Sequence, residues 1–394
     1  MSDRAYLDWN ATAPLRPEAR TAMIAAFDYV GNPSSTHAEG RAARHLVEEA
    51  REKVAALLGA EPRNVIFTSG GTEANALALT PSLAPGPDKP GCRRLLMSTI
   101  EHPSVRTGGR FRRDDITDLP VGAAGVVDLA ALEACLQAAQ AAEPASPVLV
   151  ALMHANNETG VVQPVAAAAA LVHAAGGLVH VDAVQAAGKI PCEINHLGAD
   201  LVAISAHKMG GPKGIGALVK RSEAVHLGEV LLKGGGQERG ARGGTENLIG
   251  IAGFGAAAEA AGTALARETE RIAVLRDALE EQLLAASPEA VIFGKEVERL
   301  PNTTMFALPE LKAETALIAL DLAGVAASSG SACSSGKVAG SPVLAAMHVP
   351  PALAGGAIRL SIGPATTEQE IGTFITAWRK LVAGLSNKGR SVAA

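Results

Sequence analysis

The fold of this chain is decided by Gly177-Leu178-Val179-His180-Val181-Asp182 and, further along, by Asp200-Leu201-Val202-Ala203-Ile204-Ser205-Ala206-His207-Lys208. Each stretch contains a short apolar run that suits a strand buried on both faces, as in parallel sheets. Each run is followed by polar residues, and ligands of open α/β sheets bind at the carboxyl ends of the strands. We therefore expect Asp182 and Lys208 to meet at one edge of a sheet.

A carboxylate and a lysine at neighbouring strand ends suit pyridoxal phosphate. The lysine amine forms an imine with this cofactor, and the aspartate keeps a proton on the pyridine nitrogen so that the ring accepts electrons. Taken singly, Asp182 is also explained as a helix cap and Lys208 as a solvated surface residue. The pair makes the cofactor site as strong an interpretation as these structural ones.

Composition limits the class of protein. The 394 residues exceed one ordinary hydrophobic core, which predicts two domains. A net charge of −5 predicts no direct binding of nucleic acid. Four cysteines, at positions 92, 135, 192 and 333, are too few for a disulfide framework and none has zinc-site spacing, which indicates a reducing compartment and no metal.

Neither the N-terminus nor the most apolar stretch predicts export or membrane insertion. Met1 to Arg4 lacks the basic and apolar pattern of a signal peptide. Residues 165 to 181 are apolar, but they contain His173, His180 and a Gly-Gly pair, and they are better explained as a helix, a turn and a strand. We expect a cytoplasmic protein without a membrane segment.

Strand-like and helix-like segments alternate from about residue 16 to 250, which predicts a mainly parallel sheet covered on both faces. A long helix over 249–286 leads to a smaller α+β region. The expected elements are a helix over 42–58 and strands at 65–67, 95–97, 148–153, 179–181, 201–204, 291–293, 302–306 and 358–361.

Thr68-Ser69-Gly70-Gly71-Thr72 follows the first of these strands and opens a helical segment. Glycines let the backbone approach an anion, and the free N–H groups of a helix start favour a phosphate. Taken alone, the stretch is more often a plain Gly-Gly turn. Beside a cofactor lysine, Gly71 and Thr72 become the expected phosphate cup.

Two further strand ends carry polar groups. Asn156-Asn157-Glu158 could hydrogen-bond a cofactor or a substrate carboxylate, although Asn-Asn is also a common turn. His102 could stack on an aromatic cofactor and transfer protons, although a lone histidine is more often structural.

Ser328 to Gly336 surrounds Cys333 with small residues. A thiol in such a setting could reach a cleft and later present its sulfur outside, whereas structural cysteines normally lie within an apolar pattern. We interpret Cys92, Cys135 and Cys192 as structural.

Together these motifs resemble the cysteine desulfurases of the IscS/NifS type, within the class V aminotransferases. The resemblance extends from Tyr6 to about Trp378. Met209-Gly210-Gly211 follows the lysine where many members have a tyrosine before the Gly-Pro, at a position that takes no part in the chemistry. The motifs that carry the resemblance are Asp182 to Gln185, Ser205 to Lys208 with Gly211 to Gly214, Asn156 to Glu158, Gly234 to Asn247, and Ser328 to Cys333.

The resemblance implies PLP fold type I, with a large domain at 16–255 and a small domain of 1–15 and 256–394. It implies a homodimer that converts L-cysteine to L-alanine and keeps the sulfur as a persulfide on Cys333. The implied site residues are Lys208 for the imine, Asp182 for the pyridine nitrogen, Gln185 for the ring oxygen, His102 for stacking, Thr72, Ser205, His207 and a second subunit's Thr245 for the phosphate, and Asn157 and Arg359 for the substrate carboxylate.

Two other classes remain open from the sequence. One is another PLP enzyme of this fold, such as a selenocysteine lyase or an aminotransferase, which needs no cysteine at 333. The other is a scaffold protein that has lost the chemistry, against which Lys208, Asp182 and Cys333 argue. The recipient of the sulfur, whether an iron–sulfur scaffold or another acceptor protein, has no signature that the sequence identifies.

Overall fold

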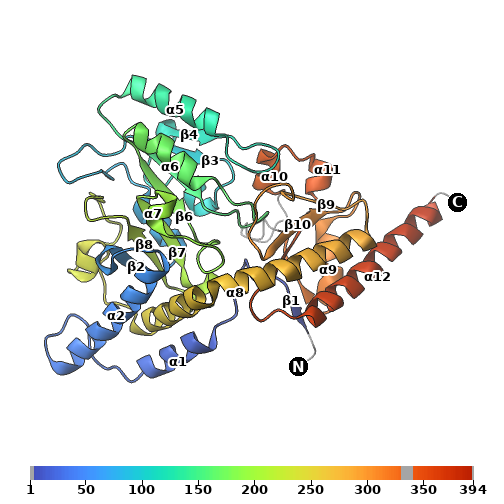
Figure 1. The fold of residues 1–394 in the computed structure, drawn as a ribbon, viewed down its shortest axis with the longest axis horizontal. Coiled ribbons are helices and arrows are strands. Elements are labelled where there is room, and N and C mark those ends of the chain that lie inside the picture. Colours follow the sequence, from blue (N-terminus) through green and yellow to red (C-terminus); the bar gives the residue numbers. More distant parts are fainter. Residues whose placement is uncertain (1–3, 330–339, 393–394) are drawn as a thin grey trace.

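The computed structural model describes residues 4–329 and 340–392. Its larger part is an α/β structure around a seven-stranded sheet, in which helices cover both faces (Figure 1). The elements of this part are α1 (Pro17–Ala26), α2 (Ala38–Leu57), β2 (Val65–Thr68), α3 (Gly71–Ala78), β3 (Arg94–Ser98), α4 (Pro103–Arg106), β4 (Ile116–Leu119), α5 (Leu129–Ala142), β5 (Val148–Met153), α6 (Val165–Ala174), β6 (Leu178–Asp182), α7 (Ile194–Leu197), β7 (Leu201–Ser205) and β8 (Gly216–Lys220).

The strand order of the sheet is β2-β8-β7-β6-β5-β3-β4. Strands β4, β3, β5, β6 and β7 pair in parallel, whereas β8 is antiparallel to both of its neighbours. The expectation of a mainly parallel sheet covered on both faces is therefore confirmed. The sequence-based assignment lacked β4 and the antiparallel β8.

Side chains of β5 alternate between two cores. Val148, Val150 and Leu152 join the core under α2, α5, α6 and the first half of the next long helix. Leu149 and Ala151 join the core on the opposite face, against α3 and α4. This explains why the strand is apolar at every position, since a strand covered on both faces has no solvent side.

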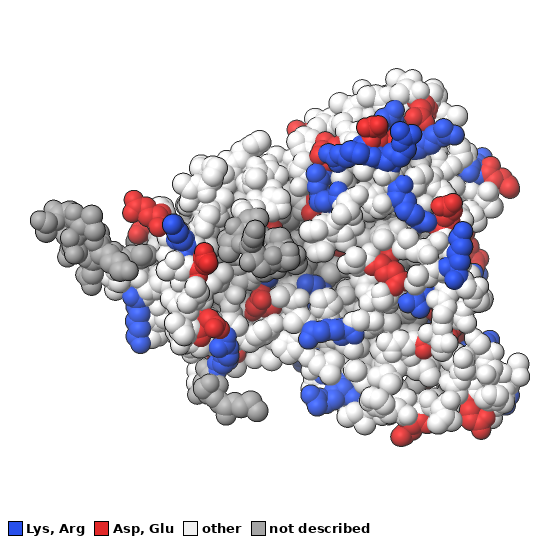
Figure 2. All heavy atoms as spheres, turned by 180° about the vertical axis from the view of Figure 1, so that it is seen from behind, with Lys and Arg blue, Asp and Glu red and all other residues white. Residues whose placement is uncertain are grey.

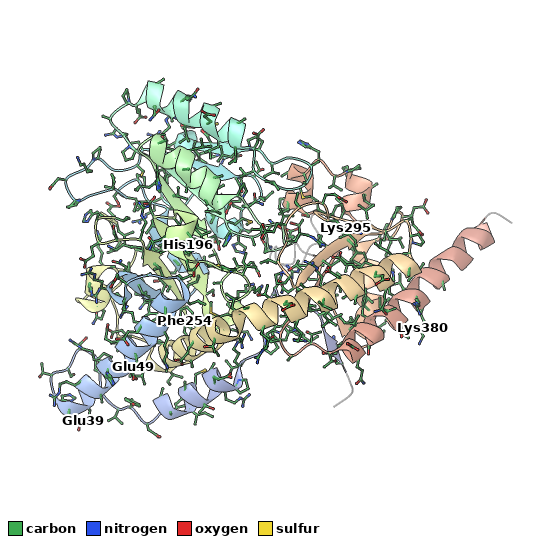
Figure 3. The ribbon with its side chains drawn as sticks, in the orientation of Figure 1. Glu39, Glu49, His196, Phe254, Lys295 and Lys380 are labelled. Atoms are coloured by element: carbon green, nitrogen blue, oxygen red, sulfur yellow. The ribbon has the colours of Figure 1, made fainter. Side chains whose placement is uncertain are left out.

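Helix α8 (Leu248–Ala286) connects the two regions of the molecule (Figure 1). Its first half packs against α1 and α2. Phe254 of this half (Figure 3) contacts Phe67 of β2 edge to face, with ring centroids 6.1 Å apart. The helix agrees with the expected range of 249–286.

The second region contains a three-stranded sheet of order β12-β10-β9 and a two-stranded sheet of β1 and β11. Its separate core includes Phe306, Phe374 and Trp378, whose rings contact one another. The expected domain boundary at 255 lies inside α8, so the division into domains stays a prediction. The elements are β1 (Ala5–Tyr6), β9 (Val291–Ile292), β10 (Thr303–Ala307), α9 (Ala313–Leu322), β11 (Val325–Ala326), α10 (Pro342–Ala346), α11 (Pro351–Ala354), β12 (Ile358–Ser361) and α12 (Glu368–Val392).

Acidic and basic side chains are interspersed on the face shown in Figure 2. Among the described residues, α8 is the one helix whose length and composition would suffice to cross a membrane. The core helix of a globular protein meets the same test, and α8 buries residues such as Ile251, Phe254 and Leu279. It therefore serves here as a core helix.

Candidate active site

A cavity of about 320 Å³ lies at the carboxyl ends of β5, β6 and β7. Its walls come from the ends of three parallel strands, the start of α3, the N-terminal segment and β12. The predicted site residues that line it are Gly71, Thr72, His102, Asn157, Asp182, Gln185, Ser205, His207, Lys208 and Arg359. The structure thus brings all of these residues together.

Asp182 ends β6 and is 6% exposed. Its Oδ2 accepts a hydrogen bond from Asn75 Nδ2 at 2.7 Å, and its Oδ1 accepts one from the Val184 N–H at 3.0 Å. Two donors hold the carboxylate in one orientation, which suits a partner for a protonated ring nitrogen.

Lys208 lies in the 3₁₀ turn Ala206–Lys208 that directly follows β7. Its Nζ donates hydrogen bonds to the carbonyl oxygens of Asn10 and Ala11. Both acceptors belong to the N-terminal segment. This segment therefore forms the wall against which the amine rests.

His102 caps α4, and its Nδ1 accepts a hydrogen bond from the Ser104 N–H at 3.1 Å. Ser104 Oγ lies 2.8 Å from the same nitrogen and itself accepts from Asn75 Nδ2 at 2.9 Å. Asn75 thus contacts both Asp182 and Ser104. Burial lowers the pKa of His102 below its usual value, so the ring is neutral at pH 7 and its proton lies on Nε2.

The end of the cavity with Gly71 and Thr72 continues into a hollow of about 510 Å³ that also reaches Ser69, His207 and Lys213. A Cβ added at Gly71 would come within 2.6 Å of Val184 Cγ2, so this close approach requires glycine. Burial, followed by the charges of Lys208, Lys213 and Lys189, lowers the pKa of His207 to about 4. This end has the backbone donors, hydroxyls and positive charge that a phosphate needs.

Arg359 of β12 carries a guanidinium into the cavity and is 3% exposed. Its Nη1 donates to the Asn157 carbonyl at 2.9 Å, and its Nη2 donates to Asp8 Oδ1 at 2.7 Å. Its Nε is buried without a hydrogen-bond partner among the described residues. Such an unpaired donor suits an anionic ligand.

Of the predicted site residues that the structure describes, Thr245 does not line this cavity. Thr245 lines a separate cavity of about 160 Å³ beside Glu238 and Arg242. Cys333 lies outside the described residues. Of the other thiols, Cys92 and Cys192 are buried, and burial raises the pKa of Cys92 to about 12 and that of Cys192 further.

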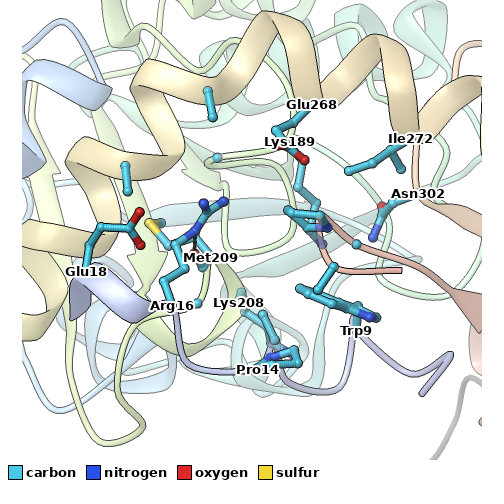
Figure 4. A pocket seen from close by; sticks show the side chains of 18 of the residues that line it. Trp9, Pro14, Arg16, Glu18, Lys189, Lys208, Met209, Glu268, Ile272 and Asn302 are labelled. Atoms are coloured by element: carbon cyan, nitrogen blue, oxygen red, sulfur yellow. Dashed lines mark hydrogen bonds between the residues drawn. The ribbon is translucent and has the colours of Figure 1, made fainter. Parts of the chain in front are cut away.

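A larger cavity of about 590 Å³ lies behind Lys208, under α8 (Figure 4). Lys189, Met209 and Trp9 line it together with Lys208. It holds none of the predicted phosphate or carboxylate ligands, so we assign the cofactor to the smaller cavity at the strand ends.

Sequence reasoning missed Asn10, Asn75 and Lys189, which contact predicted site residues, and Glu101, which is buried next to His102 in the chain. Asn75 is the seventh residue after the strand that ends at Thr68, and helical spacing turns it toward the same edge. Asn10 had no such signal, because its contacts are to residues far along the chain.

The cavity fits pyridoxal phosphate. An oriented carboxylate at Asp182, an amine at Lys208, a glycine-lined anion site and the unpaired Nε of Arg359 each match one part of the cofactor or its amino-acid substrate.

Known proteins resemble the chain over nearly its whole length. Residues 5–374 match the family model for class-V aminotransferases. A cysteine desulfurase of Cereibacter sphaeroides is 43% identical over 94% of this chain and 93% of its own, and cysteine desulfurase IscS of Dictyoglomus turgidum is 38% identical over 98% and 96%. The X-ray structure of a NifS-like protein from Rickettsia africae aligns with a TM-score of 0.86 at 34% identity, covering 96% of this chain and 99% of the other.

Proposed function

The chain belongs to the class-V aminotransferase family, and we propose that within this family it is a pyridoxal-phosphate-dependent cysteine desulfurase. It converts L-cysteine to L-alanine and leaves the sulfur on an enzyme cysteine. The carbon–sulfur bond of the substrate breaks, a sulfur–sulfur bond forms, and the substrate carbon gains a proton, so no external oxidant or reductant is needed. The observation that carries the proposal is the meeting of Asp182, Lys208 and Arg359 in one cavity.

Pyridoxal phosphate, when bound, withdraws electrons from the substrate carbon atoms and so makes the Cα proton and the Cβ–sulfur bond labile. Lys208 holds the cofactor through its amine and moves the Cα proton. Asp182 holds the ring nitrogen, and Gln185 donates to the ring oxygen. Gly71, Thr72, Ser205 and His207 bind the phosphate at the open end of the cavity.

Arg359 selects an amino acid as the substrate. Its buried guanidinium lines the cavity, so a carboxylate is the expected ligand. Asn157, whose carbonyl accepts from Arg359, orients the same end of the substrate.

His102 moves a proton at Nε2. Its Nδ1 faces the N–H of Ser104, which leaves Nε2 as the nitrogen that exchanges protons with substrate. The lowered pKa of His102 keeps the ring neutral, so its Nε2–H is a hydrogen-bond donor toward the substrate.

Cys333 is the proposed sulfur acceptor. The nucleophile has to be a thiolate, and burial raises the pKa values of Cys92 and Cys192 so far that neither forms one near pH 7. Ser328 and Arg359 exchange backbone hydrogen bonds, so the segment that carries Cys333 leaves the described structure beside the substrate-binding guanidinium.

The sulfur then passes from Cys333 to an acceptor protein, for which we propose an iron–sulfur cluster scaffold or a thio-cofactor pathway. We also propose a homodimer, in which Thr245 of a second copy completes the phosphate site, and a cytoplasmic location. The three described cysteines are free, as expected for a reducing compartment.

The test is to incubate the purified protein with pyridoxal phosphate and L-cysteine and to measure alanine and protein-bound persulfide by mass spectrometry. We expect both products from the wild type, neither from Lys208→Ala, and neither from Cys333→Ser, which should still bind the cofactor. Cys135→Ser is the matched control and should retain activity. Alanine formed at the wild-type rate by Lys208→Ala would refute the cofactor site, and persulfide on Cys135 in an active Cys333→Ser enzyme would refute the acceptor.

A further inference from the structure

Lys189 lies between the cavity of about 320 Å³ at the strand ends and the cavity of about 590 Å³ under α8. It lines the larger one (Figure 4), and its Nζ donates to Gln185 Oε1 at 2.9 Å and to Asn10 Oδ1 at 3.0 Å. Gln185 and Lys189 are four residues apart in a tight turn in which Gly188 has a left-handed backbone, with φ of +77°. The hydrogen bond between the two side chains places both on the same side of this turn.

These contacts determine which way the Gln185 amide points. Its Oε1 faces the amine of Lys189, and its Nε2 donates to the Asn10 backbone carbonyl at 2.9 Å. A carbonyl oxygen only accepts, so both contacts require the same orientation. The second N–H of the amide is then available on the side of the cavity that Gln185 lines.

Asn10 is itself held from several directions. Its Oδ1 also accepts from Asn302 Nδ2 at 3.0 Å, and its Nδ2 donates to Thr303 Oγ1 at 2.9 Å. Asn10 is 1% exposed, so these bonds are protected from water. The amide that anchors Lys189 therefore has one orientation.

No carboxylate among the described residues forms an ion pair with Lys189. Burial, followed by the positive charges of Lys208 and Arg359, lowers its pKa well below the usual range.

We propose that Lys189 is a positioning residue, which holds the Gln185 amide so that an N–H group, and not the carbonyl oxygen, faces the ring oxygen of the cofactor. This inference rests on the proposed function. A hydrogen-bond donor stabilises the negative charge on the ring oxygen. That oxygen then attracts the proton of the Lys208–cofactor linkage less strongly, so the linkage loses this proton more readily. A carbonyl in its place would have the opposite effect.

The experiment is a pH titration of the visible absorbance of the purified, cofactor-loaded protein. We expect Lys189→Met to raise the midpoint pH of the absorbance change by about one to two units, the size of one hydrogen bond to a charged group. We also expect this variant to bind the cofactor more weakly. Lys220→Met is the matched control, because Lys220 is a partly buried lysine of β8 that donates to the Val225 carbonyl in another cavity. Its midpoint should equal that of the wild type.

A double-mutant cycle separates positioning from a direct effect of the lysine charge. Gln185→Ala alone should raise the midpoint, and adding Lys189→Met should change it no further. An undiminished shift from Lys189→Met in the Gln185→Ala background would overturn the inference, as would an unshifted midpoint in the Lys189→Met single variant. If Lys189→Met does not fold, Lys189→Leu, which also lacks a donor, decides the question in the same cycle. A wild type that gains no visible band with pyridoxal phosphate would instead refute the proposed function.

Discussion

Glu101, next to His102 in the chain, is a buried carboxyl group behind the cofactor cavity. It is 4% exposed, and its Oε1 accepts from Ser98 Oγ and from the Met153 N–H, each at 2.7 Å. Its Oε2 is buried without a partner among the described residues. Burial raises the pKa of Glu101 to about 8, against the opposing effect of the two hydrogen bonds. The side chain is therefore protonated at neutral pH, which avoids a second negative charge near Asp182.

This raised pKa predicts a specific dependence of stability on pH. Between pH 4.5, the usual pKa of a glutamate, and about pH 8, the folded protein binds a proton that the unfolded chain has released, so this group lowers the stability as pH rises. Glu101→Gln, which is neutral at every pH, should gain stability relative to the wild type from pH 6 to pH 8, by at most about 1.4 kcal/mol per pH unit. Unfolding in urea at both pH values measures the difference.

Glu61→Gln is the control for this prediction, because Glu61 is exposed. Its difference from the wild type should not change with pH. An equally constant difference for Glu101→Gln would contradict a protonated Glu101.

At the scale of single residues, the sequence predicted the groups that follow strands and missed those that support them. Asp182 and Lys208 were recognisable because each stands directly after an apolar run. Asn10, Glu101 and Lys189 pack near the site through contacts with residues that are distant in the sequence. No local pattern of residues predicts such contacts. Asn10, for example, interacts with Gln185, Lys208 and Asn302.

At the scale of elements, the crossing of α2 and α8 depends on small residues. A Cβ added at Gly255 would lie 2.6 Å from Ala50 Cα and 2.7 Å from Ala50 Cβ, and neither atom can move without shifting α2. At Gly262, about two turns further along α8, the nearest atom would be Leu57 Cδ1 at 3.4 Å, an ordinary contact.

The two glycines should therefore respond oppositely to the same change. Gly255→Ala should destabilise the protein by about 1–3 kcal/mol through overpacking. Gly262→Ala should stabilise it by about 0.5–1 kcal/mol, because glycine weakens a helix interior. Thermal or urea unfolding of both variants tests this, and destabilisation by Gly262→Ala as large as that by Gly255→Ala would contradict the close crossing.

The sequence predicted long elements better than short or antiparallel ones. Helix α8 was predicted to within one residue because its apolar composition extends over many turns. Strand β8 was missed, since Gly216 to Lys220 follows a glycine-rich turn and the direction of a strand leaves no trace in its hydrophobic pattern. Strands β1 and β11 have two residues each, too few for any periodicity.

At the scale of the whole molecule, the site combines distant parts of the chain. Arg359 of β12 donates a hydrogen bond to Asp8 of the N-terminal segment. Lys208 donates to the carbonyl oxygens of Asn10 and Ala11 in the same segment. The site therefore depends on how the two regions of the molecule pack together, and the resemblance to a family indicated this where residue patterns could not.

Thr245 cannot easily join the cavity of its own chain. The loop that carries it is fixed by Glu238, whose carboxylate accepts from Arg51 Nη1 and Nη2 at 2.7 and 2.9 Å and from the Phe67 N–H at 2.9 Å. Glu238 is buried, and removing a buried, paired charge from its partner is costly. We therefore propose that Thr245, on this anchored loop, contributes to the phosphate site of a second copy of the chain.

Complementation between inactive subunits tests this arrangement. Thr245→Glu should repel the cofactor phosphate, and Lys208→Ala lacks the amine, so each homodimer should be inactive. In a heterodimer isolated through two different affinity tags, the Thr245→Glu subunit keeps its own Lys208 and receives an intact Thr245 from the Lys208→Ala subunit. We expect this one complete site to give about half of the wild-type rate of alanine formation. If Thr245 acted within its own chain, neither site of the heterodimer would be complete, and the preparation would be as inactive as the two homodimers.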